Sequence, residues 1–486
     1  MTRPPTRRRT LLAALAAAAA SLAAVAPPAR ADEGMWLFNQ PPAKLLKDRH
    51  GFDADPAWLE HLQKSAVRFG ASASFVSPDG LMLTNHHVGR GYVQRLSSPD
   101  RDLLAAGFHA RSREQEPKCP GAEARVLVRI SDVTAKVNAA AAKGASPAEA
   151  EAARRAAVLS IEQAAAGSPD KLVGQVVTLY GGARFHLYEY RRFTDVRLVF
   201  APEESIAFFG GDVDNFEFPR WDADFCLFRV YAEDGKPYRP EHYLKVAPGG
   251  AADGDLCFVA GHPGRTERAL TLDHVKHLRD VDLPTKLRDL WRREVRLRTF
   301  ADRDAELRRI AAGPVFGSAN SRKASQATLS ALQDPAFLAP LAADERALRS
   351  FVDADPAAAA KWAGAWDAVA AAQRVKAELN SRGQALSALR RSDLVEHALT
   401  IVRLAHELPK PAAERLREFG DADLPGVYHR LYAVAPIYDA MEREDLASGL
   451  AQAAETLGAD DPLVAALLAG KGPAARAAEL VAGTKL

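Results

Sequence analysis

The stretch that decides the fold of the first half of the chain is Ser72-Ala-Ser-Phe-Val-Ser-Pro-Asp-Gly-Leu-Met-Leu-Thr-Asn-His-His-Val88. Residues 73–76 and 81–83 within it predict two short strands. Between them, Pro78-Asp79-Gly80 is a typical turn sequence, so the stretch is expected to form a β-hairpin. The second strand leads into Thr-Asn-His-His, which places His87 at a strand end.

A histidine at a strand end, beside a small apolar residue, is how trypsin-like serine proteases present their general base. By this pattern His87 is the predicted base and His86 is its neighbour. Such a base needs a buried carboxylate that accepts the hydrogen of its Nδ1 atom, fixes its tautomer and stabilises the imidazolium. In trypsin-like enzymes this aspartate lies at the start of a strand.

The run Asp222-Ala-Asp-Phe-Cys-Leu-Phe-Arg-Val-Tyr231 has this second feature. Asp224 is the favoured partner of His87, because the residues that follow it fit the start of such a strand. Asp222 is the competing candidate, since residues two apart share one face of a strand. Alternatively, Asp224 has no catalytic role and only caps the start of the strand.

The sequence lacks the nucleophile of this chemistry. The serine of trypsin-like enzymes lies in a Gly-x-Ser-Gly run, whose glycines allow the tight turn that forms the oxyanion hole. No such run occurs in the chain, and the nearest matches, at Ser72 and Ser318, lack the second glycine. Ser72 precedes the base on the same hairpin and is expected to be structural.

Length and composition narrow the class of protein. The 486 residues are enough for two or three domains. The 64 Lys and Arg residues nearly balance the 62 Asp and Glu residues, whereas a nucleic-acid-binding protein usually has a strong basic excess.

Of the three cysteines, Cys119, Cys226 and Cys257, the last two lie in apolar runs and are expected to be buried. No CxxC, HExxH or zinc-finger spacing occurs, so neither a metal nor another cofactor is expected.

The N-terminus has the layout of a secretory signal peptide. Arg7-Arg8-Arg9 is a positive region, residues 11–25 are apolar, and Ala29-Arg30-Ala31 is a cleavage site of the A-x-A type. We expect residues 1–31 to be removed and the exported chain, periplasmic or extracellular, to begin at Asp32. A membrane anchor is the alternative, but the apolar run is short, and no later stretch has the ~18 uninterrupted apolar residues of a spanning helix. Stable membrane insertion is therefore not expected.

The predicted strands and helices divide the mature chain into a strand-rich region, residues 32–272, and an all-α region, residues 273–486. Helices are predicted over residues 56–69 and 146–165 of the first region. Its further predicted strands are residues 124–130, 175–180, 185–190, 194–201, 225–232 and 256–260. Many strands without regular βαβ alternation favour a β-barrel over a parallel sheet.

Several runs together resemble the bacterial dipeptidyl-peptidase 7 and dipeptidyl-peptidase 11 family of serine peptidases. Besides the Asp224 strand they are Asp-Glu-Gly-Met-Trp (32–36), Thr-Asn-His-His (84–87), Cys-Pro-Gly (119–121), Ile-Ser-Asp-Val-Thr (130–134), Gly-Gly-Asp-Val-Asp-Asn-Phe-Glu-Phe-Pro-Arg (210–220) and Gly-His-Pro-Gly-Arg-Thr (261–266). The resemblance implies a chymotrypsin-like double β-barrel with an α-helical domain inserted between the barrels. The first barrel would carry the histidine and aspartate, and the second the serine.

The resemblance also implies roles for single residues. His87 is the general base and Asp224 orients it, while Asn215 and the adjacent Phe216 help to hold the free α-amino group of a peptide. The family usually has Trp at the position of Phe216, so this chain keeps an aromatic wall but loses an N–H donor. Asn320 is a weaker candidate for a second amine contact. The alternatives are a turn residue for Asn215 and a helix N-cap for Asn320.

The expected function is that of an exported serine-type dipeptidyl-peptidase, an aminopeptidase that releases dipeptides from peptides with free N-termini. Because the chain stops at Leu486 without the second barrel, we expect an N-terminal portion of such an enzyme that ends inside the helical domain and is inactive as given. A non-catalytic remnant that binds peptide N-termini is the alternative, and a trypsin-like endopeptidase is a more distant one. The resemblance to whole members of the family also implies a homodimer as a candidate assembly.

Overall fold

The computed structural model describes residue 32 and residues 34–485, apart from residues 167–171, 265–266 and 268–269. The predicted signal peptide, residues 1–31, therefore lies outside the described residues. The chain divides into two units, Met1–His61 with Lys245–Val259 and Leu62–Leu244 with Ala260–Leu486, and each is described by itself.

The smaller unit holds α2 (Ala43–His50) and the first part of α3 (Pro56–Ser65). The ring centroid of Phe258 lies 5.1 Å from that of Phe52 and 4.9 Å from that of Trp58. The strand predicted over residues 256–260 is wrong, since this segment is irregular. Apolar residues form a strand only where a neighbouring backbone supplies the ladder hydrogen bonds. Cys257, expected to be buried in that strand, is exposed.

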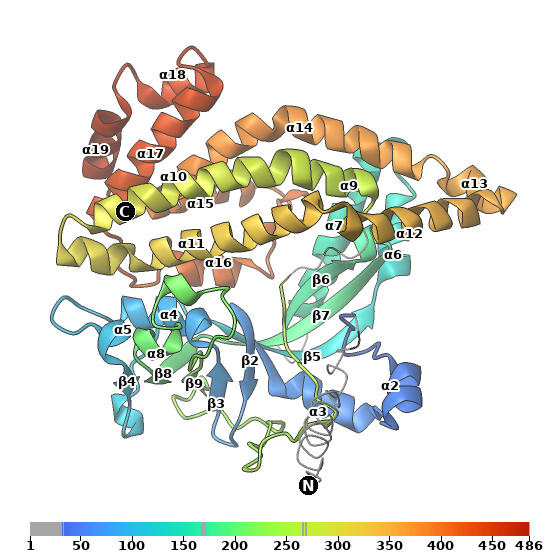
Figure 1. Ribbon diagram of the computed structural model, residues 1–486, viewed down its shortest axis with the longest axis horizontal. Coiled ribbons are helices and arrows are strands. Elements are labelled where there is room, and N and C mark those ends of the chain that lie inside the picture. Colours follow the sequence, from blue (N-terminus) through green and yellow to red (C-terminus); the bar gives the residue numbers. More distant parts are fainter. Residues whose placement is uncertain (1–31, 33, 167–171, 265–266, 268–269, 486) are drawn as a thin grey trace, which may run out of the picture. The chain divides into compact units, whose positions relative to one another are not determined.

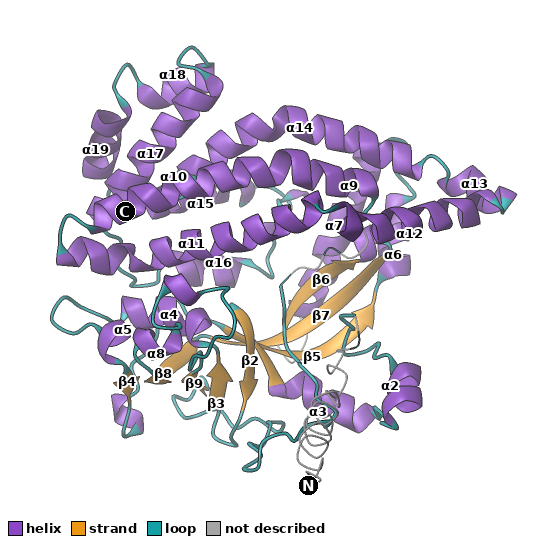
Figure 2. Cartoon of the chain, viewed as in Figure 1, coloured by secondary structure: helices purple, strands orange, loops and turns teal. Residues whose placement is uncertain are grey.

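The larger unit contains one antiparallel sheet of nine strands, which pair in the order β4-β8-β9-β3-β2-β1-β5-β7-β6 (Figure 2). In chain order the strands are β1 (Ala66–Phe69), β2 (Ala71–Phe75), β3 (Leu81–Thr84), β4 (Phe108–His109), β5 (Ala124–Asp132), β6 (Val173–Leu179), β7 (Arg184–Phe193), β8 (Asp195–Ala201) and β9 (Cys226–Tyr231). The predicted hairpin is confirmed as β2 and β3. The predicted helix over residues 56–69 is too long, because residues 66–69 pair with β2 and β5 as strand β1. The closed barrel stays a prediction.

The turn of the hairpin is built by its own residues. Ser77 Oγ accepts the backbone N–H groups of Asp79 and Leu81, both at 3.2 Å. Gly80 has a φ of 69°, and a Cβ atom there would lie 2.6 Å from the carbonyl oxygen of Tyr238. Only glycine tolerates both conditions, so the turn sequence fixes the register of β2 against β3.

The core of this unit joins the sheet to α4 (His86–Arg95) and α5 (Leu103–Ala106). Phe228 of β9 stands opposite Met82 of β3, and both side chains are fully buried. The ring centroid of Phe228 lies 5.0 Å from that of Phe69, another fully buried ring. Packing around Phe228 therefore fixes β3, β9 and α4 relative to one another.

Helical segments interrupt the strands. The predicted excursion at residues 146–165 is α7 (Pro147–Ala166), which follows α6 (Thr134–Ala141). Between β8 and β9 lie α8 (Glu204–Ala207) and the 3₁₀ turn η3 (Asp212–Asp214). Two further 3₁₀ turns are η1 (Arg113–Gln115) and η2 (Tyr180–Gly182).

From residue 272 onward the described chain is helical (Figure 1). The helices are α9 (Leu272–His277), the π-turn η4 (Leu278–Asp282), α10 (Leu283–Ala301), α11 (Ala305–Gln333), α12 (Pro335–Asp353), α13 (Pro356–Trp362), α14 (Ala365–Leu389), α15 (Asp393–Glu407), the 3₁₀ turns η5 (Ala412–Glu414) and η6 (Arg417–Phe419), α16 (Leu424–Leu431), α17 (Asp439–Leu457), α18 (Pro462–Leu468) and α19 (Pro473–Gly483). Leu297 and Phe300 of α10 pack against Ile310 and Ala311 of α11, together with Met441 of α17. The domain division at residue 272 stays a prediction.

Asp304 caps the start of α11, where its carboxylate accepts the backbone N–H of Leu307 at 2.8 Å. We expect Asp304→Ala to lower the free energy of unfolding by about 1 kcal/mol, because the first helical turn then loses an acceptor for its free donors. Urea denaturation measures the change. Asp302→Ala is the control, since Asp302 follows the C-terminal end of α10, where a carboxylate does not stabilise a helix. Equal losses in both variants would contradict the capping role.

Candidate active site

His87 lies in the first turn of a helix that follows directly on the hairpin. β3 ends at Thr84 and α4 begins at His86. The antiparallel strands β3 and β9 pair with Thr84 opposite Cys226, so the end of β3 lies beside the start of β9. This register brings His87 next to Asp224, which precedes β9 by two residues.

Asp224 makes the contacts of an aspartate that orients a histidine. Its Oδ2 atom lies 2.7 Å from His87 Nδ1, and its Oδ1 atom accepts the backbone N–H of His87 at 2.9 Å. Asn85 Nδ2 donates to Asp224 Oδ2 at 3.1 Å. The carboxylate is also at the N-terminal end of α4, where the helix dipole favours a negative charge. With Nδ1 bound to Asp224, Nε2 is the ring nitrogen that can take up a proton.

The contact between His87 and Asp224 shifts the pKa values of both side chains. The hydrogen bond with Asp224 raises the pKa of His87, although burial acts in the opposite direction. Burial acts to raise the pKa of Asp224, but the hydrogen bonds from the ring and backbone of His87 outweigh it, and the pKa is lowered. The side chain of His87 is 52% exposed and that of Asp224 22% exposed. The arrangement therefore combines an anchored anion with a ring that a reactant can reach.

The neighbouring histidine and aspartate do not form this pair. Among the described residues, the His87 ring is hydrogen-bonded to Asp224 alone. Burial and the nearby charge of Asp224 raise the pKa of Asp222. His86 is 1% exposed, and burial lowers its pKa. Of the two candidate aspartates, Asp224 is the one that is hydrogen-bonded to the His87 ring.

The residues predicted to hold a peptide amine come together from two parts of the chain. Asn215 ends the 3₁₀ turn η3, where its backbone N–H donates to the Asp212 carbonyl oxygen at 3.2 Å, so its alternative role as a turn residue is confirmed, and it is also buried. Its Nδ2 atom donates to Oδ1 of Asn320 at 3.1 Å. Asn320 lies well inside α11, so its predicted role as a helix N-cap is wrong. Phe216 is partly exposed and has a φ of 69°, a backbone conformation that is uncommon for a bulky residue.

Two cations that were not predicted from the sequence hold Asn215 in place. Arg220 Nη1 donates to Asn215 Oδ1 at 3.1 Å, and Lys323 Nζ donates to the Asn215 carbonyl oxygen at 3.1 Å. The Arg220 guanidinium also lies over the rings of Phe216 and Phe218, 5.4 and 5.0 Å from their centroids. The phenylalanine-rich run before Arg220 was a signal for this stacking. The role of Lys323 depends on tertiary structure and left no signal in the sequence.

Within the described residues, no serine hydroxyl is hydrogen-bonded to His87. Ser72 Oγ accepts the backbone N–H of His262 at 2.8 Å, in keeping with its expected structural role. Ser318 Oγ donates to the carbonyl oxygen of Pro314 at 2.8 Å. The part of the chain that the structure describes also holds no group of three or more side chains suited to binding a metal ion.

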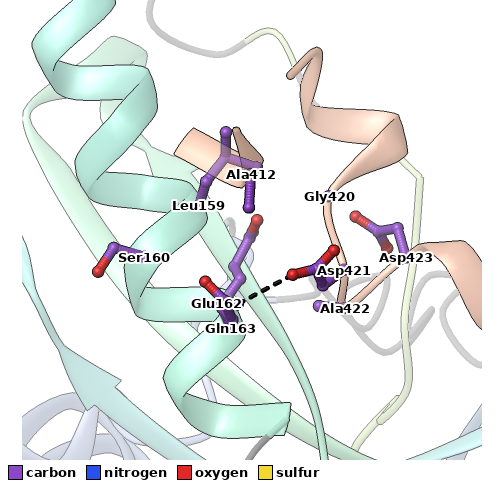
Figure 3. A pocket seen from close by; sticks show the side chains of 9 residues that line it. All are labelled: Leu159, Ser160, Glu162, Gln163, Ala412, Gly420, Asp421, Ala422 and Asp423. Carbon is purple, nitrogen blue, oxygen red and sulfur yellow. Dashed lines mark hydrogen bonds between the residues drawn. The ribbon is translucent and has the colours of Figure 1, made fainter. Parts of the chain in front are cut away.

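A separate cavity of about 150 Å³ is lined by residues of α7, by Ala412 and by residues 420–423 (Figure 3). Gln163 Nε2 donates to an oxygen of Asp421 at 2.9 Å, and Arg417 binds Glu162 at 2.5 Å. Its lining includes neither His87 nor Asp224. The cavity is therefore not part of the candidate active site.

A comparison with known families decides the relationship, because the Peptidase S46 family matches residues 31–486. The chain belongs to the peptidase S46 family. This is a family of serine-type peptidases. A dipeptidyl-peptidase 7 of Porphyromonas endodontalis is 36% identical over 266 residues, which are 50% of this chain and 32% of that protein. An Asp/Glu-specific dipeptidyl-peptidase of Shewanella putrefaciens is 28% identical over 460 residues, which are 90% of this chain and 62% of that protein.

Solved structures show the same fold. The crystal structure of Porphyromonas endodontalis DPP11 in complex with the dipeptide Arg-Glu has a TM-score of 0.73 and 25% sequence identity, and the match covers 92% of this chain and 67% of that chain. The mixed α and β architecture of this S46 chain is thus shared with that protein. The S46 chain spans 32% and 62% of the lengths of its two relatives named above.

In this S46 chain we expect Asp224→Asn to lower the pKa of His87, because an amide does not stabilise the imidazolium as a carboxylate does. Since the pKa of His87 is raised, the pair stabilises the fold fully below the ordinary pKa of histidine, and this contribution is lost as pH rises through the raised value. The lowered pKa of Asp224 contributes stability above the ordinary pKa of aspartate, which is lost as pH falls through the lowered value.

Titration of the histidine rings by NMR measures this pKa change. Asp222→Asn is the matched control, because Asp222 lies two residues away and makes no hydrogen bond to the His87 ring. An equal fall of the His87 pKa in both variants would show that general charge, rather than the bond to Asp224, raises it.

Proposed function

We propose that this chain carries the general base and the amine-binding residues of a serine-type dipeptidyl-peptidase, which releases dipeptides from the N-termini of peptides. The observation that carries the proposal is the 2.7 Å contact between His87 Nδ1 and Asp224 Oδ2. Family membership and the names of the relatives, which are dipeptidyl-peptidases, support it.

The pair suits acyl transfer to a serine. As the serine Oγ attacks the carbonyl carbon of the second substrate residue, its proton moves to Nε2 of His87. Asp224 holds the hydrogen on Nδ1 and stabilises the imidazolium. His87 then gives its proton to the leaving amine, and a water molecule, deprotonated by the same nitrogen, hydrolyses the serine ester. We propose that this serine lies outside residues 1–486, in which no Gly-x-Ser-Gly run occurs.

Recognition of the free amine would make the enzyme an exopeptidase. An ammonium group needs fixed oxygen acceptors, and the 3.1 Å hydrogen bond from Asn215 Nδ2 to Asn320 Oδ1 orients both amides. Each amide oxygen has two lone pairs, so each can accept a second hydrogen bond besides the one that it already accepts. Phe216 adds a partly exposed aromatic wall beside them. An anchored amine places the carbonyl of the second residue, rather than another, near His87.

We further propose that the protein is exported, periplasmic or extracellular, and that residues 1–31 are removed. The arginine run, the apolar segment and the A-x-A sequence support this. In the described chain, no helix combines the length and apolar character needed to span a membrane. Mass spectrometry of the protein from its cells should find Asp32 at the N-terminus, and a retained residue 1 would contradict cleavage. A homodimer stays a prediction.

Calorimetric titration of residues 32–486 with the dipeptide Arg-Glu tests the proposed activity. Free Arg-Glu should bind at least about tenfold more tightly than N-acetyl-Arg-Glu, because hydrogen bonds to a charged group contribute about 1.5–3 kcal/mol. Equal affinities would contradict amine recognition.

A dipeptidyl-arylamide assay of the same protein should show no turnover. Turnover that is abolished by His87→Ala would place the nucleophile within the chain and overturn that part of the proposal.

A further inference from the structure

The two ends of the proposed site lie on separate elements, and α11 binds both of them. α4 carries His87, and the segment after η3 carries Asn215. α4 contacts α11 near residues 309–316, whereas the Asn215 segment contacts it at residues 320–323. α11 therefore spans the distance between the general base and the amine-binding residues.

The contact with α4 lies at an interruption of α11. Pro314 has no backbone N–H, so the carbonyl oxygen of Ile310 lacks its helical donor. Gln94 of α4 supplies a donor instead, since its Nε2 atom lies 3.3 Å from the Ile310 oxygen and 3.0 Å from the Arg309 oxygen. A Cβ atom on Gly313 would lie 2.9 Å from Gln94 Oε1, so glycine leaves room for this approach.

Arg90 makes a second contact between the same two helices. Its side chain is 7% exposed and pairs with Glu204 of α8 at 2.5 Å. Its guanidinium lies 5.3 Å from the ring centroid of Phe316 in α11. Together with Gln94, this buried cation fixes α4 at one position along α11.

The contact with the amine-binding segment is made by two residues of α11 that are three positions apart and so share a helix face. Asn320 accepts from the Asn215 side chain, as described above. Lys323 Nζ donates to the carbonyl oxygens of both Asp212 and Asn215 and lies 3.5 Å from the Asp212 carboxylate. Its ammonium thus has three oxygen neighbours, which matches the three donors of lysine. Lys323 therefore holds the backbone of the segment that presents Asn215.

We propose that α11 sets the spacing between His87 and the amine-binding residues, and that Lys323 is the positioning residue at the amine end of this spacer. The inference rests on the proposed dipeptidyl-peptidase function. An extended dipeptide is only about 7 Å long, so the amine and the reacting carbonyl must be placed to within a fraction of that length. Misplacement by about 1 Å can cost on the order of a hundredfold in rate.

The test is the ratio of the Kd values of N-acetyl-Arg-Glu and free Arg-Glu, measured by calorimetry with residues 32–486. Lys323→Met keeps most of the aliphatic side chain and removes the donors, and it should reduce this ratio about tenfold. Lys323→Gln keeps two N–H donors and should retain part of the ratio. Lys286→Met, at an exposed lysine of α10, is the matched control and should leave the ratio unchanged.

Hydrogen exchange separates positioning from a general loss of structure. In Lys323→Met we expect faster exchange confined to residues 210–220 and an unchanged unfolding temperature. If the wild-type ratio of the two Kd values is near one, both the proposed function and this inference are wrong. A wild-type preference for the free amine that Lys323→Met and Lys323→Gln both retain in full would overturn this inference alone.

Discussion

Asn215→Ala should remove most of the preference of residues 32–486 for a dipeptide with a free amine, a loss of about 10- to 100-fold in the ratio of the two Kd values. The Asn215 side chain is buried and bonded on both sides, to Asn320 through Nδ2 and to Arg220 through Oδ1. Its removal takes away one proposed acceptor and releases the second one, Asn320, from its fixed orientation. Calorimetry with free and acetylated Arg-Glu measures the ratio.

Asn138→Ala is the matched control for this prediction. Asn138 is an exposed asparagine of α6, so its loss should leave both affinities unchanged. Thermal unfolding of each variant shows whether the fold is intact. A folded Asn215→Ala protein with the wild-type ratio would mean that the amine is bound elsewhere.

Phe228→Ala should lower the free energy of unfolding by about 3–5 kcal/mol, the usual cost of removing a large buried ring. Phe228 is fully buried, and its ring packs against Phe69 and Tyr92 with centroid distances of 5.0 and 6.1 Å. A Cβ atom on Gly89 of α4 would lie 2.9 Å from the same ring, which shows how closely the helix of His87 rests on it. The substitution should therefore loosen the His87–Asp224 pair as well as the core.

Urea denaturation measures the stability of this variant, and Phe351→Ala is its control. Phe351 of α12 is 75% exposed, so its loss should change stability by no more than about 0.5 kcal/mol. Similar losses in the two variants would show that the core around Phe228 is not the element that holds the sheet and α4 together.

Local sequence was enough to predict the hairpin and the His87–Asp224 pair. The turn Pro78-Asp79-Gly80 has strict backbone requirements, and Gly80 meets them through its positive φ and its close approach to Tyr238. The pairing of β3 with β9 then brings together two residues whose types already pointed to one chemistry. Each of the two motifs can be recognised in a single sequence because it consists of a few neighbouring residues, whereas the contact between His87 and Asp224 depends on the pairing of β3 with β9.

Other features depend on contacts that no local pattern records. Residues 256–260 have strand-like composition, but no ladder forms there. Residues 66–69 continue a helical pattern, yet pairing with β2 and β5 makes them a strand. The contacts of Asn320 and Lys323 with Asn215 join residues more than a hundred positions apart in the chain, so they depend on tertiary packing.

The most direct test of the central claim is a crystal structure of residues 32–486 with the free dipeptide Arg-Glu bound. We expect the amino nitrogen of the dipeptide to lie within hydrogen-bond distance, about 3 Å, of the side-chain oxygens of Asn215 or Asn320. We also expect the carboxyl carbon of the second residue to face Nε2 of His87. A dipeptide bound in the opposite direction, or away from both His87 and Asn215, would show that these residues do not form the proposed site.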